Sequence, residues 1–303
     1  MRALVTGASG FLGSRLCQAL LARGDAVIGL TRDPERARTA VPAVTWHGWD
    51  PTSERPPPSA LEGVDAVVNL IGEPIDQRWT DDAKRRIRES RERSTKNLID
   101  ALSAAEPRPP LLLSQSAVGY YGDRGGALVD ESTGPGSGFD SRVCVSWEEA
   151  ARAAAELGIR VVVTRTGLVL DPDGGLLKQL LVPFKLGVGG PIAGGGQWMP
   201  WIHVADWVRL VLWALDGDAA SDTYNATAPS PVTNGELSRA LGGALHRPAA
   251  VPVPKLALKA RFGNEAAEAV VASLRVIPRR ASDEGFEFAH PDLEPALRDL
   301  LRR

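Results

Sequence analysis

The feature that most constrains this chain is a glycine-rich turn close to its N-terminus. The segment VTGASGFLG places Gly7, Gly10 and Gly13 directly after the apolar run ALVT and at the start of a helix-like pattern, LGSRLCQALLAR. Such glycines permit a tight turn, let the backbone approach a pyrophosphate, and let the helix pack close to the strand. The start of the helix then offers unpaired amide groups and partial positive charge to phosphates. A bare structural turn is the alternative, but the pattern favours a dinucleotide site, with contacts from Gly7, Ser9, Gly10, Phe11, Leu12 and Gly13.

Short apolar runs alternate with helix-like patterns through the first two thirds of the chain. The strand-like runs are ALVT (3–6), AVIGL (26–30), AVTW (43–46), DAVVNLI (65–71), LLLSQS (111–116) and RVVVTRT (160–166). Alternating strands and helices are typical of a parallel sheet covered on both faces. With right-handed crossovers, this predicts an α/β fold with a doubly wound parallel sheet of the Rossmann type.

The composition of the chain changes after residue 170. GVGGPIAGGGQWMPWIH (187–203) is rich in Gly, Pro and Trp and is interpreted as a long ordered loop. From about residue 229 a helix-rich, Pro-punctuated tail follows, with a short strand predicted at GFEF (285–288) and a last helix after it. We therefore expect a nucleotide-binding domain over 1–170, to which 201–228 returns, and a smaller α+β substrate lobe built from 171–200 and 229–303.

Composition and charge exclude several classes of partner. The net charge is −2 with both signs scattered, so no basic face predicts nucleic acid or a membrane surface as partner. No apolar run approaches the roughly 20 residues that span a bilayer, and the start MRALVTG is typical of a strand and not of a signal peptide. Two cysteines and four dispersed histidines give neither a disulfide framework nor metal-ligand spacing. We expect a cytoplasmic protein without a metal; the sequence does not encode its oligomeric state.

The end of the second strand decides which dinucleotide is expected. An NAD site places a carboxylate there for the ribose 2′-hydroxyl, whereas an arginine accommodates a 2′-phosphate. The sequence GLTRDPER puts Thr31 and Arg32 at this point, with Asp33 one residue later and next to a proline. A hydroxyl beside a guanidinium suits phosphate, because the guanidinium offers a fork of donors. We predict NADP(H), with a solvated loop arginine as the alternative.

Longer motifs give the chain a family resemblance. VTGASGFLG, NLIGEP, SQSAVGYYGD and the strand end Arg-Thr-Gly resemble the extended short-chain dehydrogenases/reductases. PFKLGVGGPIAGGGQWMPWIHVADW (183–207), APSPVTNGEL (228–237) and the tail through SLRVIPRRASDEGFEFAHPDLEPAL are similar to an atypical, sugar-nucleotide-epimerase-like subgroup with a C-terminal domain of unknown function. The resemblance covers essentially the whole chain. Because ligands of such sheets lie outside the carboxyl ends of the strands, it also predicts cofactor contacts from Leu70, Ile71, Gly72, Arg91, Gly167 and Leu168.

The proton relay that the resemblance implies is mostly missing. In active relatives a Ser or Thr, a Tyr-xxx-Lys helix and an Asn handle the substrate hydroxyl. Ser116 matches the Ser, whereas Asp140 falls at the Tyr position, Cys144 at the Lys position and Arg91 at the Asn position. A neutral thiol neither lowers the pKa of a tyrosine nor holds ribose hydroxyls, while the charge of Arg91 is permanent.

Other side chains are candidates for an alternative route. Tyr120 and Tyr121 end the SQSAVGYYG segment, and Glu73 follows NLIG. The candidate catalytic residues are Ser116, Tyr121, Asp140, Cys144 and Glu73. Each also has a structural interpretation: a capping or loop carboxylate for Glu73 and Asp140, a small buried hydrophobe for Cys144, and a strand-end hydroxyl for Ser116.

Two functional hypotheses follow. The first is an NADP-dependent oxidoreductase or epimerase that acts on a small substrate bearing a hydroxyl or carbonyl group, nucleotide-sugar-like or other. The second is a non-catalytic NADPH-binding module, such as a redox sensor or a partner-binding protein. An intact cofactor turn with a dismantled relay favours the second, whereas an elaborate second lobe favours the first.

Overall fold

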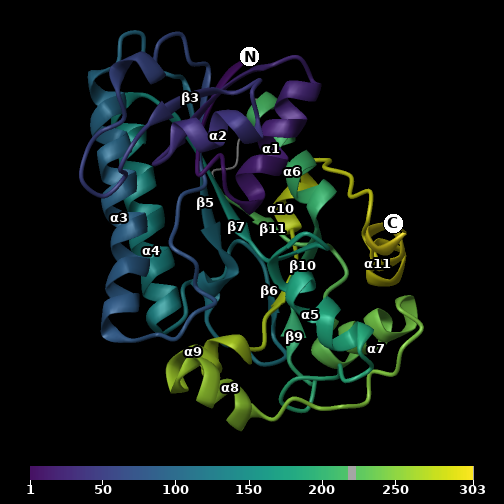
Figure 1. Ribbon diagram of the computed structural model, residues 1–303. Helices are drawn as coiled ribbons and strands as arrows, with labels where there is room; N and C mark the ends of the chain where they lie inside the picture. Colours follow the sequence, from purple (N-terminus) through teal and green to yellow (C-terminus); the bar gives the residue numbers. More distant parts are fainter. Residues whose placement is uncertain (218–222, 303) are drawn as a thin grey trace.

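A seven-stranded parallel sheet forms the centre of the computed structural model, which describes residues 1–217 and 223–302 (Figure 1). The strand order β11-β7-β5-β4-β1-β2-β3 reverses direction at β1, which confirms the predicted doubly wound α/β fold. The strands are β1 (Arg2–Thr6), β2 (Ala26–Thr31), β3 (Thr45–Gly48), β4 (Ala66–Asn69), β5 (Leu111–Ala117), β7 (Arg160–Thr166) and β11 (Thr223–Ala226). Residues 218–222, inside the predicted return segment 201–228, and Arg303 lie outside the described residues.

Helices cover both faces of the sheet, and each strand contributes side chains to both layers. Ala3 and Val5 of β1 pack with α1 and α6, whereas Leu4 between them packs with α3. Because both faces are buried, the strands are continuous apolar runs and do not alternate. The covering helices are α1 (Phe11–Ala22), α2 (Pro34–Ala40), α3 (Asp81–Ala104), α4 (Phe139–Arg152) and α6 (Val204–Asp216).

The remaining helices lie mostly below and to the right of the sheet in Figure 1, with α8 and α9 at the bottom and α10 beside β11. They are α5 (Gly175–Lys185), α7 (Asn234–Ala244), α8 (Lys255–Phe262), α9 (Asn264–Val270), α10 (Arg279–Asp283) and α11 (Leu293–Leu301). Helices α5, α7 and α11 share one buried apolar cluster. The chain is completed by short 3-10 helices, η1 (Pro58–Ala60), η2 (Val118–Tyr121) and η3 (Ala153–Leu157).

Three pairs of short strands connect the C-terminal elements to one another and to the rest of the chain. They are β8 (Leu168–Asp171) with β10 (Trp201–His203), β9 (Trp198–Met199) with β12 (Val232–Thr233), and β6 (Leu128–Val129) with β13 (Arg275–Val276). The predicted loop 187–203 therefore ends in two short strands, β9 and β10. Their ladders hold its tryptophan-rich half in place.

The strand predicted at GFEF (285–288) is wrong. Gly285 has a φ of 87°, and no β-ladder includes these four residues. Their alternating aromatic side chains pack instead on α6: Phe286 lies edge-on to Trp213, with ring centroids 5.6 Å apart, and Phe288 lies edge-on to Phe286. The apolar alternation was thus produced by anchoring to a helix and not by pairing in a sheet.

Candidate cofactor and catalytic site

The turn between β1 and α1 requires glycine at two positions. Gly7 has a φ of +64°, and a Cβ on it would lie 3.1 Å from the carbonyl oxygen of Leu70 at the exit of β4. A Cβ on Gly13 would lie 2.2 Å from the carbonyl oxygen of Gly7. Gly7 thus allows the left-handed turn, and Gly13 allows the helix to approach it, as the sequence motif predicts.

The N-terminus of α1 is open and uncapped. Gly10 is the N-cap, no side chain caps the helix, and its first turn contains no acidic residue. The amide of Ser14 donates to Gly10, so the amides of Phe11, Leu12 and Gly13 precede the first intrahelical bond. Ser9 and Gly10 are exposed. This arrangement fits a pyrophosphate, which would accept from unpaired amides at the positive end of the helix.

Arg32, at the end of β2, lines a cavity of about 530 Å³. The other lining residues, from the end of β3 and the segment after it, are Gly48, Trp49, Asp50 and Glu54. The nearby carboxylate of Asp33 accepts from the amide of Arg36 at 3.0 Å and caps α2. One carboxylate oxygen of Asp33 is therefore used by the helix cap, whereas Arg32 lines the cavity.

The loop after β4 is held against Arg91 of α3. One guanidinium nitrogen donates to the carbonyl oxygens of Glu73, at 3.1 Å, and Ile87, at 3.0 Å. The guanidinium lies 5.0 Å from the centroid of the Trp147 ring, and a Cβ on Gly72 would lie 2.9 Å from its central carbon. Burial lowers the pKa of Arg91, and no carboxylate within the described part of the chain forms an ion pair with it.

Cys144, at the position of the missing lysine, lies close to this charge. Burial raises the pKa of its thiol to about 12, and the Arg91 charge is the next influence, in the opposite direction. The thiol is therefore protonated at neutral pH and is a poor nucleophile. Arg91 thus places a positive charge near Cys144.

Ser116 and Tyr121 belong to a buried network centred on an ion pair. The Ser116 hydroxyl donates to Glu148 at 2.7 Å, and Arg165 binds both carboxylate oxygens of Glu148 at 2.9 Å. A further nitrogen of Arg165 donates to the Tyr121 hydroxyl at 3.0 Å, which donates to Asn225 at 2.7 Å. Burial raises the pKa of Tyr121 to about 12. Ser116 and Tyr121 have no exposed area.

Asp140 and Glu73 are half-buried and keep part of their surface open. Asp140 lies in the first turn of α4, and its carboxylate would be 3.3 Å from a Cβ on Gly119. Burial raises the pKa of Asp140. The Glu73 carboxylate accepts from Gln77 at 3.3 Å and from Arg86 at 3.5 Å. Asp140 is therefore the candidate acid without a side-chain ion pair among the described residues.

Gly167 and Leu168, at the end of β7, fold closely onto the segment before β10. A Cβ on Gly167 would lie 2.1 Å from the carbonyl oxygen of Pro200, and the amide of Leu168 donates to that oxygen at 2.7 Å. Leu168 is half-buried. The structure thus places these two residues at the carboxyl edge of the sheet, next to the tryptophan-rich loop.

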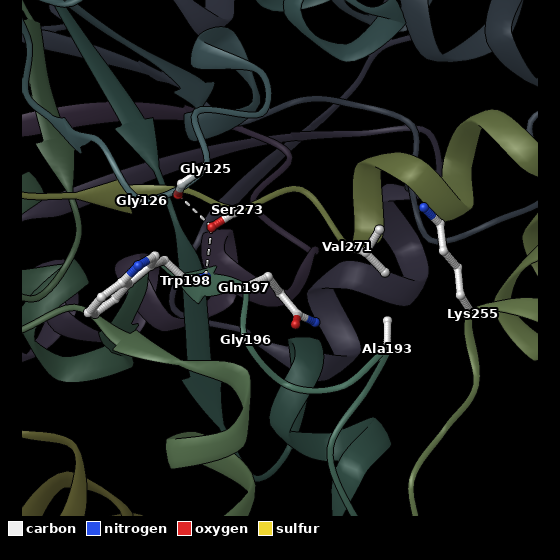
Figure 2. A pocket seen from close by; sticks show the side chains of 9 residues that line it. All are labelled: Gly125, Gly126, Ala193, Gly196, Gln197, Trp198, Lys255, Val271 and Ser273. Carbon is white, nitrogen blue, oxygen red and sulfur yellow. Dashed lines mark hydrogen bonds between the residues drawn. The ribbon is translucent and has the colours of Figure 1, made fainter.

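A second cavity, of about 480 Å³, opens among the C-terminal elements (Figure 2). Ser273 connects two of the segments that line it: its hydroxyl donates to the carbonyl oxygen of Gly125 at 2.6 Å and accepts from the amide of Trp198 at 3.1 Å. Figure 2 shows the Gln197 side chain directed toward Ala193 and the Trp198 ring directed away. The lining residues are Gly125, Gly126, Ala193, Gly196, Gln197, Trp198, Lys255, Val271 and Ser273.

Two clusters of side chains were not predicted from the sequence. Glu148 lies one helical turn after Cys144, and Arg165 is a charged residue inside an apolar strand, which is a signal for a buried ion pair. His203, His290 and Asp299 meet although they are far apart in sequence. The His203 Nδ1 accepts from the Ala205 amide at 3.0 Å, so its Nε2 carries the proton and offers no lone pair to a cation.

No helix in the described residues, 1–217 and 223–302, is both long and apolar enough to cross a membrane.

Known proteins match this chain over its full length. The family model described as NAD dependent epimerase/dehydratase family matches residues 3–227, and a domain of unknown function, DUF1731, matches residues 253–300. The chain is 40% identical over 304 residues to the Arabidopsis thaliana protein named epimerase family protein SDR39U1 homolog, chloroplastic, covering 100% of this chain and 87% of the relative.

Solved structures agree with this assignment. Human epimerase family protein SDR39U1 (isoform 2), crystallised with NADPH, superposes with a TM-score of 0.90 at 34% identity, over 100% of both chains. A UDP-glucuronic acid 4-epimerase from Bacillus cereus, in complex with UDP-glucuronic acid and NAD, has a TM-score of 0.79 at 17% identity, over 100% of this chain and 99% of that one. The second likeness concerns the fold alone. From the family model and the full-length relatives, the chain belongs to the NAD dependent epimerase/dehydratase family.

Proposed function

We propose that this protein binds NADP(H) and uses it in a reaction on a hydroxyl or carbonyl group of a small-molecule substrate. The observation that carries the proposal is the combination of an uncapped α1 N-terminus with the Arg32 cavity at the end of β2. The first suits a pyrophosphate, and Arg32, which lines the second together with the carboxylates of Asp50 and Glu54, offers a guanidinium to a 2′-phosphate. The human relative crystallised with NADPH supports the same coenzyme.

The residues present fit the coenzyme, as the glycine contacts of the turn indicate. A Cβ at Gly7 or Gly13 would come too close to neighbouring backbone atoms, so the turn carries no side chain at these positions. Its backbone is therefore the surface that would contact the coenzyme. Bound NADP(H) supplies the hydride chemistry. The residues proposed to hold it are Gly7, Ser9, Gly10, Phe11, Leu12 and Gly13 at the turn, Thr31 and Arg32 after β2, Leu70, Ile71, Gly72 and Arg91 at the β4 exit, and Gly167 and Leu168 after β7.

The substrate is proposed to lie between the nucleotide-binding part, 1–170 with 201–228, and the lobe formed by 171–200 and 229–303. The cavity of Figure 2 belongs to that lobe and to the turn before β6, and glycine backbone, an amide and a hydroxyl line it. These groups suit a polar substrate with hydroxyl groups. A nucleotide sugar is one member of this class.

Asp140 is the side chain best suited to move a proton. It is half-buried, burial raises the pKa of its carboxyl, and it stands at the position of the missing tyrosine. A carboxyl with a raised pKa is a better acid near neutral pH than an exposed one. Arg91 is proposed to provide the positive charge of the missing lysine. Glu73, Ser116, Tyr121 and Cys144 stay predictions as catalytic residues.

The test combines binding with turnover. Calorimetry at one salt concentration should give a lower Kd for NADPH than for NADH. The rate of NADPH oxidation with a panel of carbonyl compounds should fall in Asp140→Asn. It should not fall in the control Asp283→Asn, which changes an acidic residue on α10. Equal or tighter binding of NADH would refute the coenzyme assignment. Full activity of the Asp140→Asn variant would refute the role of the acid.

A binding module without turnover is the second candidate, and a specific observation favours it. Ser116 and Tyr121 have no exposed area, their hydroxyls are bonded to protein groups, and the Cys144 thiol is buried. Three of the five catalytic candidates are thus engaged in packing. NADPH binding without oxidation on any member of the carbonyl panel would favour this second function.

A further inference from the structure

Two adjacent tyrosines, Tyr120 and Tyr121, have opposite environments. Tyr121 has no exposed area, and its hydroxyl bonds to Asn225 and Arg165. Tyr120 is half-buried, and its hydroxyl makes no hydrogen bond within the described part of the chain. The Tyr120 hydroxyl is also absent from the buried unpaired atoms, so it reaches solvent. Of the pair, Tyr120 has the hydroxyl that is available to a ligand.

The ring of Tyr120 is fixed although its hydroxyl is free. The Arg165 guanidinium lies 3.4 Å from the ring centroid, and the Tyr121 ring packs edge-on at 5.3 Å. Arg165 is itself held by both oxygens of Glu148. A cation over a ring face is attracted by the electrons of the ring, most strongly where water is excluded. The ion pair therefore orients Tyr120 without using its O–H group.

Tyr120 also lies where a substrate would meet the edge of the sheet. It follows β5 directly, and ligands of doubly wound sheets lie outside the carboxyl ends of the strands. Its neighbour Gly119 approaches Asp140 of α4. On the other side, Tyr120 packs against the cluster that contains Leu274, whose neighbour Ser273 lines the cavity of Figure 2.

We infer that Tyr120 donates a hydrogen bond to the reacting oxygen of the substrate and takes over this part of the role of the tyrosine missing from α4. The inference rests on the proposed function. From the sequence, Tyr121 is the candidate catalytic tyrosine of the pair; the inference places the hydrogen-bond donor at Tyr120. Tyr121 then serves as a positioning residue that holds Arg165.

Nitration of tyrosine tests this without a known substrate. The chain contains three tyrosines, and Tyr121 and Tyr224 have no exposed area. Tetranitromethane followed by peptide mass spectrometry should therefore label Tyr120 first. Saturating NADPH should slow this labelling several-fold, whereas 2′-phospho-ADP-ribose, which lacks the nicotinamide half, should leave it unchanged.

The outcomes separate this inference from the proposed function. Calorimetry first establishes whether NADPH binds; if it does not, the proposed function fails, and this inference fails with it. If NADPH binds but the labelling of Tyr120 is unchanged, or both nucleotides protect equally, only the inference is overturned.

Tyrosine-to-phenylalanine substitutions give a matched second test. Tyr120→Phe should keep the Tm and the Kd for NADPH but lower kcat by about 10²–10³-fold, the usual effect of removing one hydrogen-bond donor from a developing oxyanion. Tyr224→Phe, which removes a buried hydroxyl that donates to Glu284, should leave kcat of the folded protein within a few-fold. Wild-type kcat in Tyr120→Phe, or the same loss in both variants, would contradict the inference.

Discussion

The β1–α1 turn and the Arg165 network lie at the same carboxyl edge of the sheet but are built in opposite ways. The turn offers backbone amides that have no protein acceptor, and it excludes side chains: a Cβ on Gly13 would lie 2.2 Å from a carbonyl oxygen. The network is made of side chains that satisfy one another, from Ser116 through Glu148 to Arg165. An open donor set is available to bind, whereas a saturated one mainly stabilises.

This difference distinguishes a region that can bind a ligand from one that mainly holds the fold together. Unpaired amides at a helix N-terminus indicate an anionic ligand even when no ligand is present. A hydroxyl that already donates to a buried carboxylate has a protein partner and does not indicate a ligand. The free groups at the network's margin, Tyr120 and Asp140, are therefore better candidates for chemistry than its centre.

The largest expected effect is on the network. Arg165→Met should lower the free energy of unfolding by about 3–5 kcal/mol, because it removes both close hydrogen bonds of a guanidinium to the buried carboxylate of Glu148 and leaves only Arg152, at 3.6 Å, as a cationic partner. Urea unfolding measures this loss. The double variant Glu148→Met/Arg165→Met should recover most of it, since apolar residues often replace a buried ion pair at little cost. A loss below about 1 kcal/mol in the single variant would mean that Arg152 or water compensates the charge of Glu148.

The turn is next in the order of effects. Gly13→Ala should lower the free energy of unfolding by about 2–3 kcal/mol, because the added methyl overlaps backbone and forces helix α1 away from the turn. NADPH affinity, measured by calorimetry, should fall with it. Gly126→Ala is the matched control, as nothing lies within 4 Å of its Cβ position. Unchanged affinity in Gly13→Ala would show that the coenzyme does not use this turn.

The contrast between the turn and the network also explains which features could be predicted from the sequence and which could not. The turn, the strands and the helices over 1–170 follow from local patterns, because glycine spacing and apolar runs report the geometry of neighbouring residues. The network joins residues 116, 121, 148, 165 and 225, which no local period connects. The GFEF strand was wrong for a related reason: an alternating pattern reports burial, and a helix buried those phenylalanines.

Substitution of Arg32 tests whether this side chain recognises the 2′-phosphate of the coenzyme. Arg32→Gln should raise the Kd for NADPH by about tenfold, or 1.5 kcal/mol, which is the low end for a hydrogen bond to a charged group. The Kd for NADH should stay within twofold, since it has no 2′-phosphate. Arg36→Gln, on the adjacent helix but outside the cavity, is the control. Equal losses for both coenzymes would point to a general charge effect and not to phosphate recognition.

The smallest expected effect is the change of the free energy of unfolding with pH that is due to the buried side chain of His203. Burial lowers its pKa, and the stacked ring of His290, with centroids 3.8 Å apart, lowers it further. The nearby carboxylates of Asp206 and Asp299 act in the opposite direction. Because His203 accepts from the Ala205 amide through Nδ1, a second proton would break the cap of α6.

The sign follows from the lowered pKa. Unfolded histidine titrates near pH 6.5, so below that pH the unfolded chain takes up a proton that the folded chain still refuses. The free energy of unfolding should therefore be fully present above about pH 6.5 and fall as the pH drops toward the folded pKa of His203. Urea unfolding between pH 7.5 and 5.5 measures this slope. His203→Asn keeps a capping oxygen but does not titrate, so its slope should be shallower. Equal slopes would place the pH response at other groups and leave His203 as a cap alone.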